Sequence, residues 1–169
     1  MNYILRPWKS SDVNSLCKYA NNKSIADSLR DMFPYPYTRE DGEYFINLAT
    51  HFPKERGFIY AIELNGEAIG NISLDVKDNV YCKTAEVGYW LGEPYWRQGI
   101  MTGALSEVVA MAFKNYDICR VYGEVLEDNI GSRHVLEKAG LHLEAVLKKS
   151  IYKNGNIYNS CIYAKVKED

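Results

Sequence analysis

The chain has 169 residues, of which 47% are hydrophobic, and this length predicts one globular domain over residues 1–169 with a sizeable core. Its 20 basic and 22 acidic side chains give a net charge of −2, so no general basic field would attract nucleic acid or an anionic membrane. No apolar run approaches the ~20 residues that span a bilayer, and residues 1–7 already follow a strand pattern. We therefore expect a cytoplasmic protein with no nucleic-acid or membrane partner.

The cysteines and histidines show no metal-binding pattern. The cysteines are Cys17, Cys82, Cys119 and Cys161, and they have no Cys-x-x-Cys spacing and no histidine nearby in ligand register. We expect reduced, mostly buried thiols and no metal. The histidines, His51, His134 and His142, lie in unrelated contexts without a nucleophile partner, so we expect structural roles for all three.

The N-terminal part of the chain predicts a strand and three helices. Residues 3–6 have a strand pattern, and residues 10–12 offer N-cap chemistry for a first helix. A second helical stretch is predicted around residues 25–29. Two prolines in residues 33–37 forbid a regular helix there and leave three aromatic side chains on an extended segment. Thr38 then caps a third helix.

The middle of the chain changes to the period of strands. Asn65-Gly66 lies between two apolar runs and is a strong signal for a type I′ hairpin turn. We therefore expect antiparallel strands at residues 57–64 and 67–76. A further strand is predicted at about residues 81–91.

The next elements predict a crossover between parallel strands. A helix over residues 101–115 separates the strand that ends near residue 91 from a strand over residues 120–126. A short strand–helix–strand connection of this kind is right-handed and makes its two strands parallel. The sequence thus predicts a glycine-bearing loop at the carboxyl end of the first of these strands.

The C-terminal part predicts a helix and a hairpin. Asn129 can cap a helix that Gly140 ends, and Asn154-Gly155 can close a hairpin between residues 141–152 and 156–166. Together these elements predict an α/β (α+β) fold with a central, twisted mixed sheet of six or seven strands and helices on both faces.

The segment from Gly88 to Gly103 has the order of an anion cradle: an apolar strand, a basic loop with glycine, and a helix. Helix N-termini carry unpaired N–H groups and partial positive charge, so a loop of this kind can bind a phosphate or diphosphate. Arg97 would add charge, and Gly99 would allow close backbone approach. The alternative for Arg97 is an ordinary surface charge.

Three segments carry a resemblance to a known family. They are residues 86–91 on the strand before the loop, residues 95–102 in the loop, and residues 129–141 on the following helix. In this order and spacing the chain resembles the GNAT N-acetyltransferase superfamily, and within it the RimJ/RimL-like ribosomal-protein N-terminal acetyltransferases. Two loop positions depart from the usual superfamily pattern, since Trp96 stands at its first position and Met101 at its last.

The resemblance implies acetyl transfer from acetyl-CoA, as co-substrate, to a primary amine, above all the N-terminal α-amine of a protein or peptide. It implies that cofactor binding is mainly the work of the backbone, with the pantetheine arm along one strand and the diphosphate in the loop. It also implies a stabilising backbone N–H near residues 89–91 for the developing oxyanion. The implied cofactor-binding residues are Tyr89, Trp90, Leu91, Arg97, Gln98, Gly99, Ile100, Met101, Thr102, Asn129 and Ser132.

Glu86 and Ser132 are the implied catalytic residues. Glu86 is a carboxylate in an otherwise apolar strand, on one face with Gly88 and Trp90, and would serve as the general base that deprotonates the amine. Leu136 stands where many members of the superfamily carry a tyrosine that protonates the departing thiolate, which leaves Ser132 as the candidate acid. The alternatives are a solvated carboxylate on an exposed sheet face for Glu86 and a first-turn helix role for Ser132 and Asn129.

The resemblance places the acceptor walls on the segment between the early helices and on the last hairpin. Phe33, Tyr35 and Tyr37 are the candidate acceptor contacts, and the alternative is an ordinary hydrophobic connection. Asn159 stands where an acidic residue is common in related chains, which would weaken attraction for a cationic acceptor.

The acceptor itself stays open at this point. A small-molecule N-acetyltransferase acting on a polyamine, an amino acid or an amine antibiotic is one alternative, and a non-catalytic CoA-binding module is another. The strand patterns are compatible with a monomer or a homodimer.

Overall fold

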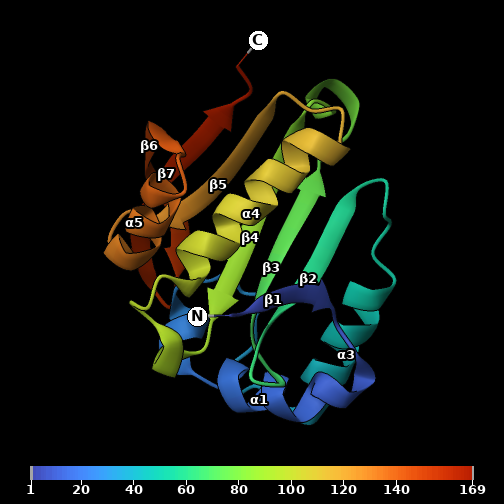
Figure 1. Cartoon of the computed structure of the whole chain (residues 1–169). Helices are drawn as coiled ribbons and strands as arrows, with labels where there is room; N and C mark the ends of the chain where they lie inside the picture. Colours follow the sequence, from blue (N-terminus) through green and yellow to red (C-terminus); the bar gives the residue numbers. More distant parts are fainter. Residues whose placement is uncertain (1, 169) are drawn as a thin grey trace. The chain divides into compact units, whose positions relative to one another are not determined.

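The computed structural model describes residues 2–168 and has a seven-stranded mixed sheet with the strand order β1-β2-β3-β4-β5-β7-β6 (Figure 1). The strands are β1 (Ile4–Pro7), β2 (Gly57–Leu64), β3 (Glu67–Val76), β4 (Thr84–Leu91), β5 (Arg120–Leu126), β6 (His142–Lys153) and β7 (Asn156–Val166). The helices are α1 (Val13–Ala20), α2 (Lys23–Asp27), α3 (Arg39–Thr50), α4 (Ile100–Asn115) and α5 (Ile130–Lys138). The predicted mixed sheet is thus confirmed, with seven strands.

The predicted elements are all present, and their ends move by a few residues. The largest shift is at β4, which was expected from residue 81 and begins at Thr84. A 3-10 helix over Asn79–Tyr81 occupies the start of the predicted strand, and Asn79 has a positive φ of 56°. Asparagine tolerates this left-handed conformation better than most residues, so the turn into β4 comes later than the apolar pattern indicates.

The chain forms two compact units, of which the first comprises Met1–Ser73 and Gly88–Ile100. In it β1 pairs with β2 in antiparallel register, from Ile4 opposite Glu63 to Pro7 opposite Tyr60. The predicted cap of α3 is confirmed, because the Thr38 side chain accepts a hydrogen bond from Asp41 N–H and the Asp41 side chain accepts one from Thr38 N–H.

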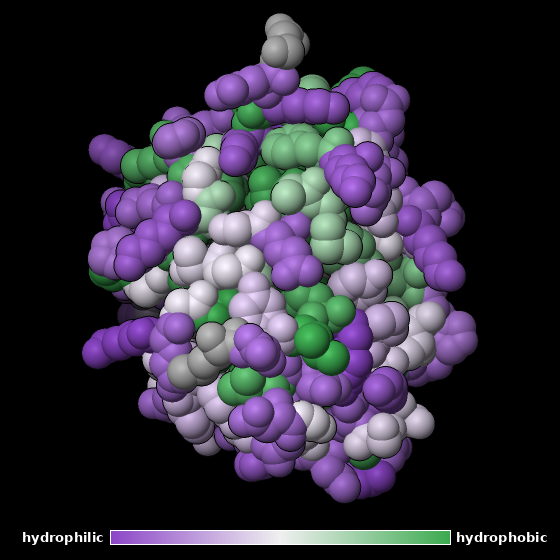
Figure 2. Space-filling view, in the orientation of Figure 1, coloured by the Kyte–Doolittle hydropathy of each residue, from purple (hydrophilic) through white to green (hydrophobic). Residues whose placement is uncertain are grey.

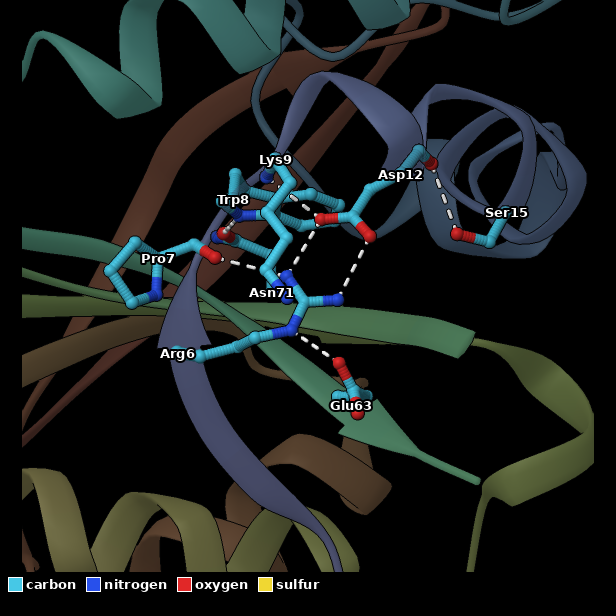
Figure 3. A network of polar contacts seen from close by, with 8 residues as sticks. All are labelled: Arg6, Pro7, Trp8, Lys9, Asp12, Ser15, Glu63 and Asn71. Carbon is cyan, nitrogen blue, oxygen red and sulfur yellow. Dashed lines mark hydrogen bonds and ion pairs between the residues drawn. The ribbon is translucent and has the colours of Figure 1, made fainter. Parts of the chain in front are cut away.

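A buried ion network joins β1, β2 and the start of α1 in this first unit (Figure 3). The Arg6 guanidinium donates to both carboxylate oxygens of Asp12, at 2.7 and 2.8 Å, and also to Glu63. Asp12 accepts a further hydrogen bond from Lys9 N–H at 2.8 Å. A bidentate pair of this kind fixes direction as well as distance, so the network sets where the chain turns from β1 into α1.

The second unit comprises Leu74–Val87 and Met101–Asp169. The predicted crossover is confirmed, since β4 and β5 pair in parallel from Thr84 opposite Arg120 to Glu86 opposite Tyr122. Strand β7 pairs antiparallel with both β5 and β6 (Figure 1). The turn residues Asn154 and Gly155 have positive φ of 51° and 80°, as a type I′ hairpin requires.

The expectation of mostly buried thiols is wrong for two of the four cysteines. Cys161 lies buried in β7, whereas Cys82 and Cys119 are exposed and Cys17 is half-buried. The exposed pair lies in the segments that precede β4 and β5, beyond the part of each strand that faces the core. All four thiols are free, as expected.

The surface and the helices agree with the composition. The face of the molecule in Figure 2 is mostly hydrophilic, and its apolar side chains lie in separate patches. Within residues 2–168, no helix has the length and apolar character needed to cross a membrane. The same residues contain no group of three or more His, Cys, Asp and Glu side chains that could hold a metal ion.

Candidate functional site

The loop after β4 is fastened to the end of that strand. The Trp96 indole Nε1–H donates to the Leu91 carbonyl oxygen at 2.6 Å, and the Gly92 N–H donates to the Ile69 carbonyl at 2.8 Å. Further along, the Gln98 side-chain amide donates to the Pro94 carbonyl at 2.8 Å. These contacts tie residues 92–98 to the ends of β3 and β4 and to one another.

Helices α1 and α2 also hold this loop in the first unit. The Tyr95 hydroxyl lies 2.9 Å from the Tyr19 hydroxyl, which in turn contacts Glu67, and Asn22 donates to the Glu93 carboxylate. Burial, together with the hydrogen bond to Glu67, raises the pKa of Tyr19 to about 12, so its hydroxyl keeps its proton and donates.

The backbone of the loop has the conformation of an anion cradle. Arg97 and Gly99 both have positive φ, 62° and 78°, and alternation of left-handed with ordinary residues turns successive N–H groups toward one side. A Cβ placed on Gly99 would meet no atom within 4 Å, so the backbone there is open to a ligand. Helix α4 begins immediately afterwards at Ile100. The loop therefore has the backbone geometry of an anion site, and its role toward the diphosphate of coenzyme A stays a prediction.

The predicted cofactor residues divide by exposure. Arg97, Gln98 and Gly99 are exposed, whereas the side chains of Ile100 and Met101 are buried in the core. The next residue, Thr102, is half-buried in the first turn of α4. Only backbone groups of Ile100 and Met101 are therefore candidates for contact with a cofactor.

The predicted acceptor segment packs onto β4 through an aromatic cluster. The Phe33 ring lies 5.8 Å from Trp90 in an edge-to-face arrangement and 5.2 Å from the Tyr37 ring. Trp90 and Tyr37 are buried, and burial raises the pKa of Tyr37. Tyr35 is 52% exposed. The structure thus gives Trp90 and Tyr37 core roles and leaves Phe33 and Tyr35 as the accessible aromatic side chains of this segment.

Glu86, in the second unit, forms an ion pair with Lys77. The Lys77 Nζ lies 2.6 Å from Glu86 Oε2 and 3.3 Å from Asp75 Oδ2. The side chains of Glu86 and Lys77 are 13% and 25% exposed. Burial is the largest single influence and acts to lower the pKa of Lys77, but the hydrogen bond to Glu86 and the attraction of the acidic groups of Glu86, Tyr122 and Asp75 together raise the pKa. Lys77 therefore stays charged, and Glu86 is held rather than free in solvent.

A cavity of about 480 Å³ lies beside this ion pair. It is lined by Lys77, Asp78, Tyr81, Thr84, Arg120 and Tyr122. Glu86 is not itself part of the lining, but two of its neighbours are: Lys77, its ion-pair partner, and Tyr122, which stands opposite Glu86 in the pairing of β4 with β5. Arg120 is itself paired with Glu144. The two cations of the lining are thus both neutralised by carboxylates.

Asn129 and Ser132 form the cap of α5. The Asn129 Oδ1 accepts a hydrogen bond from Ser132 N–H at 3.1 Å, which confirms the capping role of Asn129 and leaves its amide nitrogen available for a second contact. Leu136 is fully buried, and a Cβ placed on Gly123 would lie 3.0 Å from it. The leucine at the usual tyrosine position is therefore a core residue without chemistry.

The Asn159 position retains a negative charge nearby. Asn159 Nδ2 donates to the Glu127 carboxylate at 2.7 Å, while its Oδ1 accepts from Lys149 N–H. The carboxylate absent at position 159 is thus supplied by a neighbouring side chain. No local sequence pattern predicts this contact, because it joins residues 32 positions apart.

Sequence reasoning also missed Lys77. Its ammonium group is the partner of Glu86, yet Lys77 lies beyond β3 in a polar stretch that favours no particular role. The Lys77 N–H donates to the Thr84 carbonyl at 2.9 Å, and this backbone contact brings the two side chains together. Only the register of the chain between β3 and β4 could have revealed the pair.

Comparisons with known proteins identify the family of the chain. The model of the acetyltransferase (GNAT) domain family matches residues 2–142 of the chain. The uncharacterized N-acetyltransferase YoaA of Bacillus subtilis is 31% identical over 121 residues, 70% of this chain and 68% of that protein. The ribosomal-protein-serine acetyltransferase of Escherichia coli is 31% identical over 114 residues, 66% of this chain and 63% of that protein. The chain spans about half, 48%, of the probable N-acetyltransferase YjcK of Bacillus subtilis, with 39% identity over 52% of this chain.

Two solved structures resemble the whole chain. RimL, a ribosomal L7/L12 alpha-N-protein acetyltransferase in complex with coenzyme A, has a TM-score of 0.88 and 26% identity, covering 99% of this chain and 95% of that one. The microcin C7 self-immunity acetyltransferase MccE, in complex with acetyl-CoA and AMP, has a TM-score of 0.85 and 26% identity, covering 97% and 92%. The chain therefore belongs to the GNAT acetyltransferase family and is an acetyl-CoA-dependent N-acetyltransferase.

Proposed function

We propose that the enzyme acetylates the N-terminal α-amine of a protein or peptide. The observation that carries this proposal is the likeness over 99% of the chain to an alpha-N-protein acetyltransferase, joined by the likeness to a ribosomal-protein-serine acetyltransferase. The half-buried Glu86 and the cavity beside it support the proposal, because an acceptor amine needs both a base and a place next to it.

Each part of the chain has a role in this proposal. Acetyl-CoA supplies an activated acetyl thioester. Backbone N–H groups between Arg97 and Ile100 hold its diphosphate, and the Asn129 amide nitrogen contacts its pantetheine arm. Glu86 accepts a proton from the acceptor ammonium, directly or through one water, and the Ser132 hydroxyl supplies a proton to the departing sulfur. The protein thereby makes the amine neutral before it reacts.

The chemistry of the base favours an α-amine over a lysine side chain. The pKa of a model α-amino group is about 8 and that of a lysine side chain about 10.4. Deprotonation of the lysine at neutral pH therefore costs about 3 kcal/mol more. A carboxylate that is held by an ammonium group is a weak base and suits the more acidic amine.

The experiment that tests the proposal compares three matched acceptors by release of free coenzyme A. The first is a peptide with a free N-terminus and no lysine, the second is the same peptide with a blocked N-terminus and one internal lysine, and the third is a set of polyamines and amino acids. We expect kcat/KM for the free N-terminus to exceed that of the blocked peptide by at least tenfold. Equal rates for the first two acceptors, or release with small amines alone, would contradict the proposal.

The observation that favours a small-molecule acceptor is the likeness to MccE, which was solved with acetyl-CoA and AMP. A polyamine or a free amino acid would then occupy the cavity beside the Glu86–Lys77 pair. The third acceptor set tests this second function. If the enzyme acetylates small molecules, the polyamines or amino acids will react and both peptides will stay unmodified.

A further inference from the structure

Lys77 is held between two carboxylates at the edge of the cavity. Its Nζ contacts Glu86 at 2.6 Å and Asp75 at 3.3 Å, and its side chain also lines the cavity. Lys77 therefore both contacts the proposed base and lines the space proposed for the acceptor. A lysine in this place either assists the reaction or only neutralises the charge of Glu86. These two roles predict different pH–rate profiles when Lys77 is replaced.

We infer that Lys77 is a positioning residue for acetyl transfer, which fixes the direction of the Glu86 carboxylate and keeps it ionised. The inference rests on the proposed role of Glu86 as the base. The short contact uses Oε2 of Glu86 and thereby limits rotation of the carboxylate, so that the other oxygen keeps one direction. A carboxylate held in this way does not have to change its orientation when the acceptor binds.

The other charged groups around the pair contact Lys77 at a longer distance or have partners of their own. Asp75 competes for Lys77, but at 3.3 Å it is the longer contact. Tyr122, opposite Glu86 in β5, and Asp78 face the same cavity, and Arg120 is already paired with Glu144. Lys77 is thus a cation of the cavity lining that directly contacts Glu86.

Removal of Lys77 would leave Asp75 and Glu86 without the cation that both contact. Each carboxylate would then disfavour the charge of the other, and Glu86 would take up a proton at a higher pH than in the native enzyme. Because only the ionised carboxylate acts as a base, the acidic limb of the pH–rate profile should move to higher pH.

The experiment measures kcat/KM against pH for the native enzyme, Lys77→Met and Lys77→Arg, with one N-terminal peptide and saturating acetyl-CoA. We expect the acidic limb of Lys77→Met to move up by about one pH unit and its rate at neutral pH to fall about tenfold. Lys77→Arg keeps the charge and should restore the native limb. The matched control is Lys83→Met, which removes a cation paired with exposed Asp117 and should leave the profile unchanged.

A rate of Lys77→Met that falls equally at every pH, with an unmoved limb, would overturn the inference, because a purely structural role predicts that result. A second measurement separates this failure from failure of the proposed function. The carboxyl carbon of Glu86 is followed by NMR during a pH titration and assigned with Glu86→Gln. An identical titration in the native enzyme and Lys77→Met overturns the inference. A shifted titration with a fully active Glu86→Gln supports the ion-pair effect and overturns the role of Glu86 as the base.

Discussion

The indole of Trp96 donates a hydrogen bond to the carbonyl oxygen of Leu91, five residues earlier, at 2.6 Å. The contact joins the last residue of β4 to the loop that forms the anion cradle. Trp96 stands at a position where most members of the superfamily carry glutamine or arginine. Trp96 is 40% exposed, so it is not a core residue. Its indole instead ties the loop to the end of β4.

Loss of the hydrogen bond from Trp96 to Leu91 should weaken cofactor binding. Trp96→Phe keeps an aromatic ring but loses the donor, and one hydrogen bond contributes about 1 kcal/mol. We expect the Kd for acetyl-CoA, measured by isothermal titration calorimetry, to rise about fivefold, with little change in thermal stability. The control is Trp8→Phe, which removes the indole hydrogen bond to Asn71 in the same unit. It should lower thermal stability and leave the Kd unchanged, and the reverse result would refute the assignment of the loop.

Glycine is needed at position 99 because of its backbone conformation, and not because neighbouring atoms leave no room for a Cβ. Its φ of 78° is costly for residues with a Cβ, although a Cβ there would meet no atom within 4 Å. Gly99→Ala should therefore lower the free energy of unfolding by about 1 kcal/mol. It should also raise the Kd for acetyl-CoA about tenfold, because the added methyl group occupies the open side of the cradle.

Gly66 offers a matched control for this substitution. It has a φ of 85°, and a Cβ there would also meet no atom within 4 Å, but it lies in the hairpin turn between β2 and β3. Gly66→Ala should have a similar cost in stability, measured by urea unfolding, and no effect on the Kd. Equal effects of both variants on acetyl-CoA binding would exclude the cradle at Gly99.

Local signals in the sequence predicted the fold well, because each acts within a few residues. The turn at Asn65-Gly66 and the cap at Thr38 both have the predicted conformation. Contacts at the site depend on strand register, which hydrophobic periodicity does not define. The Glu86 pair with Lys77 could not be predicted for this reason, although Glu86 was singled out as a residue. The Trp96 contact with Leu91 depends instead on the conformation of the loop after β4, which the sequence pattern does not define.

The cap of α5 allows the structural role of Asn129 to be separated from its proposed contact with the cofactor. Its side-chain oxygen caps the helix, while its amide nitrogen is the proposed contact with pantetheine. Asn129→Ser keeps a capping oxygen and should preserve stability, whereas Asn129→Ala should cost about 1 kcal/mol. Both variants lack the amide nitrogen and should raise the Kd for acetyl-CoA about fivefold. A native Kd in Asn129→Ser, measured by calorimetry, would restrict Asn129 to capping.

The Arg6–Asp12 network of Figure 3 should make stability depend on pH in the acid range. Burial acts to raise the pKa of Asp12, but hydrogen bonds from Arg6 and from Lys9 N–H outweigh it and hold the pKa below its ordinary value. A carboxyl group of this kind stabilises the fold above its unfolded pKa of about 4. This stabilisation is lost as the pH falls through the lower folded pKa.

Asp12→Asn should therefore lower the free energy of unfolding by about 3 kcal/mol at pH 7, because it leaves the buried guanidinium of Arg6 with Glu63 alone. The difference between the variant and the native enzyme should shrink as the pH falls below about 4, where the native carboxylate also takes up its proton. Urea unfolding from pH 7 to below about pH 4 measures the difference at neutral pH and its decrease in acid. Glu43→Gln is the control, since its exposed pair with Arg39 should contribute less than about 0.5 kcal/mol at any pH. A difference for Asp12→Asn that stays constant down to pH values well below 4 would show that the loss is one of packing, because only the charge of Asp12 is linked to proton uptake.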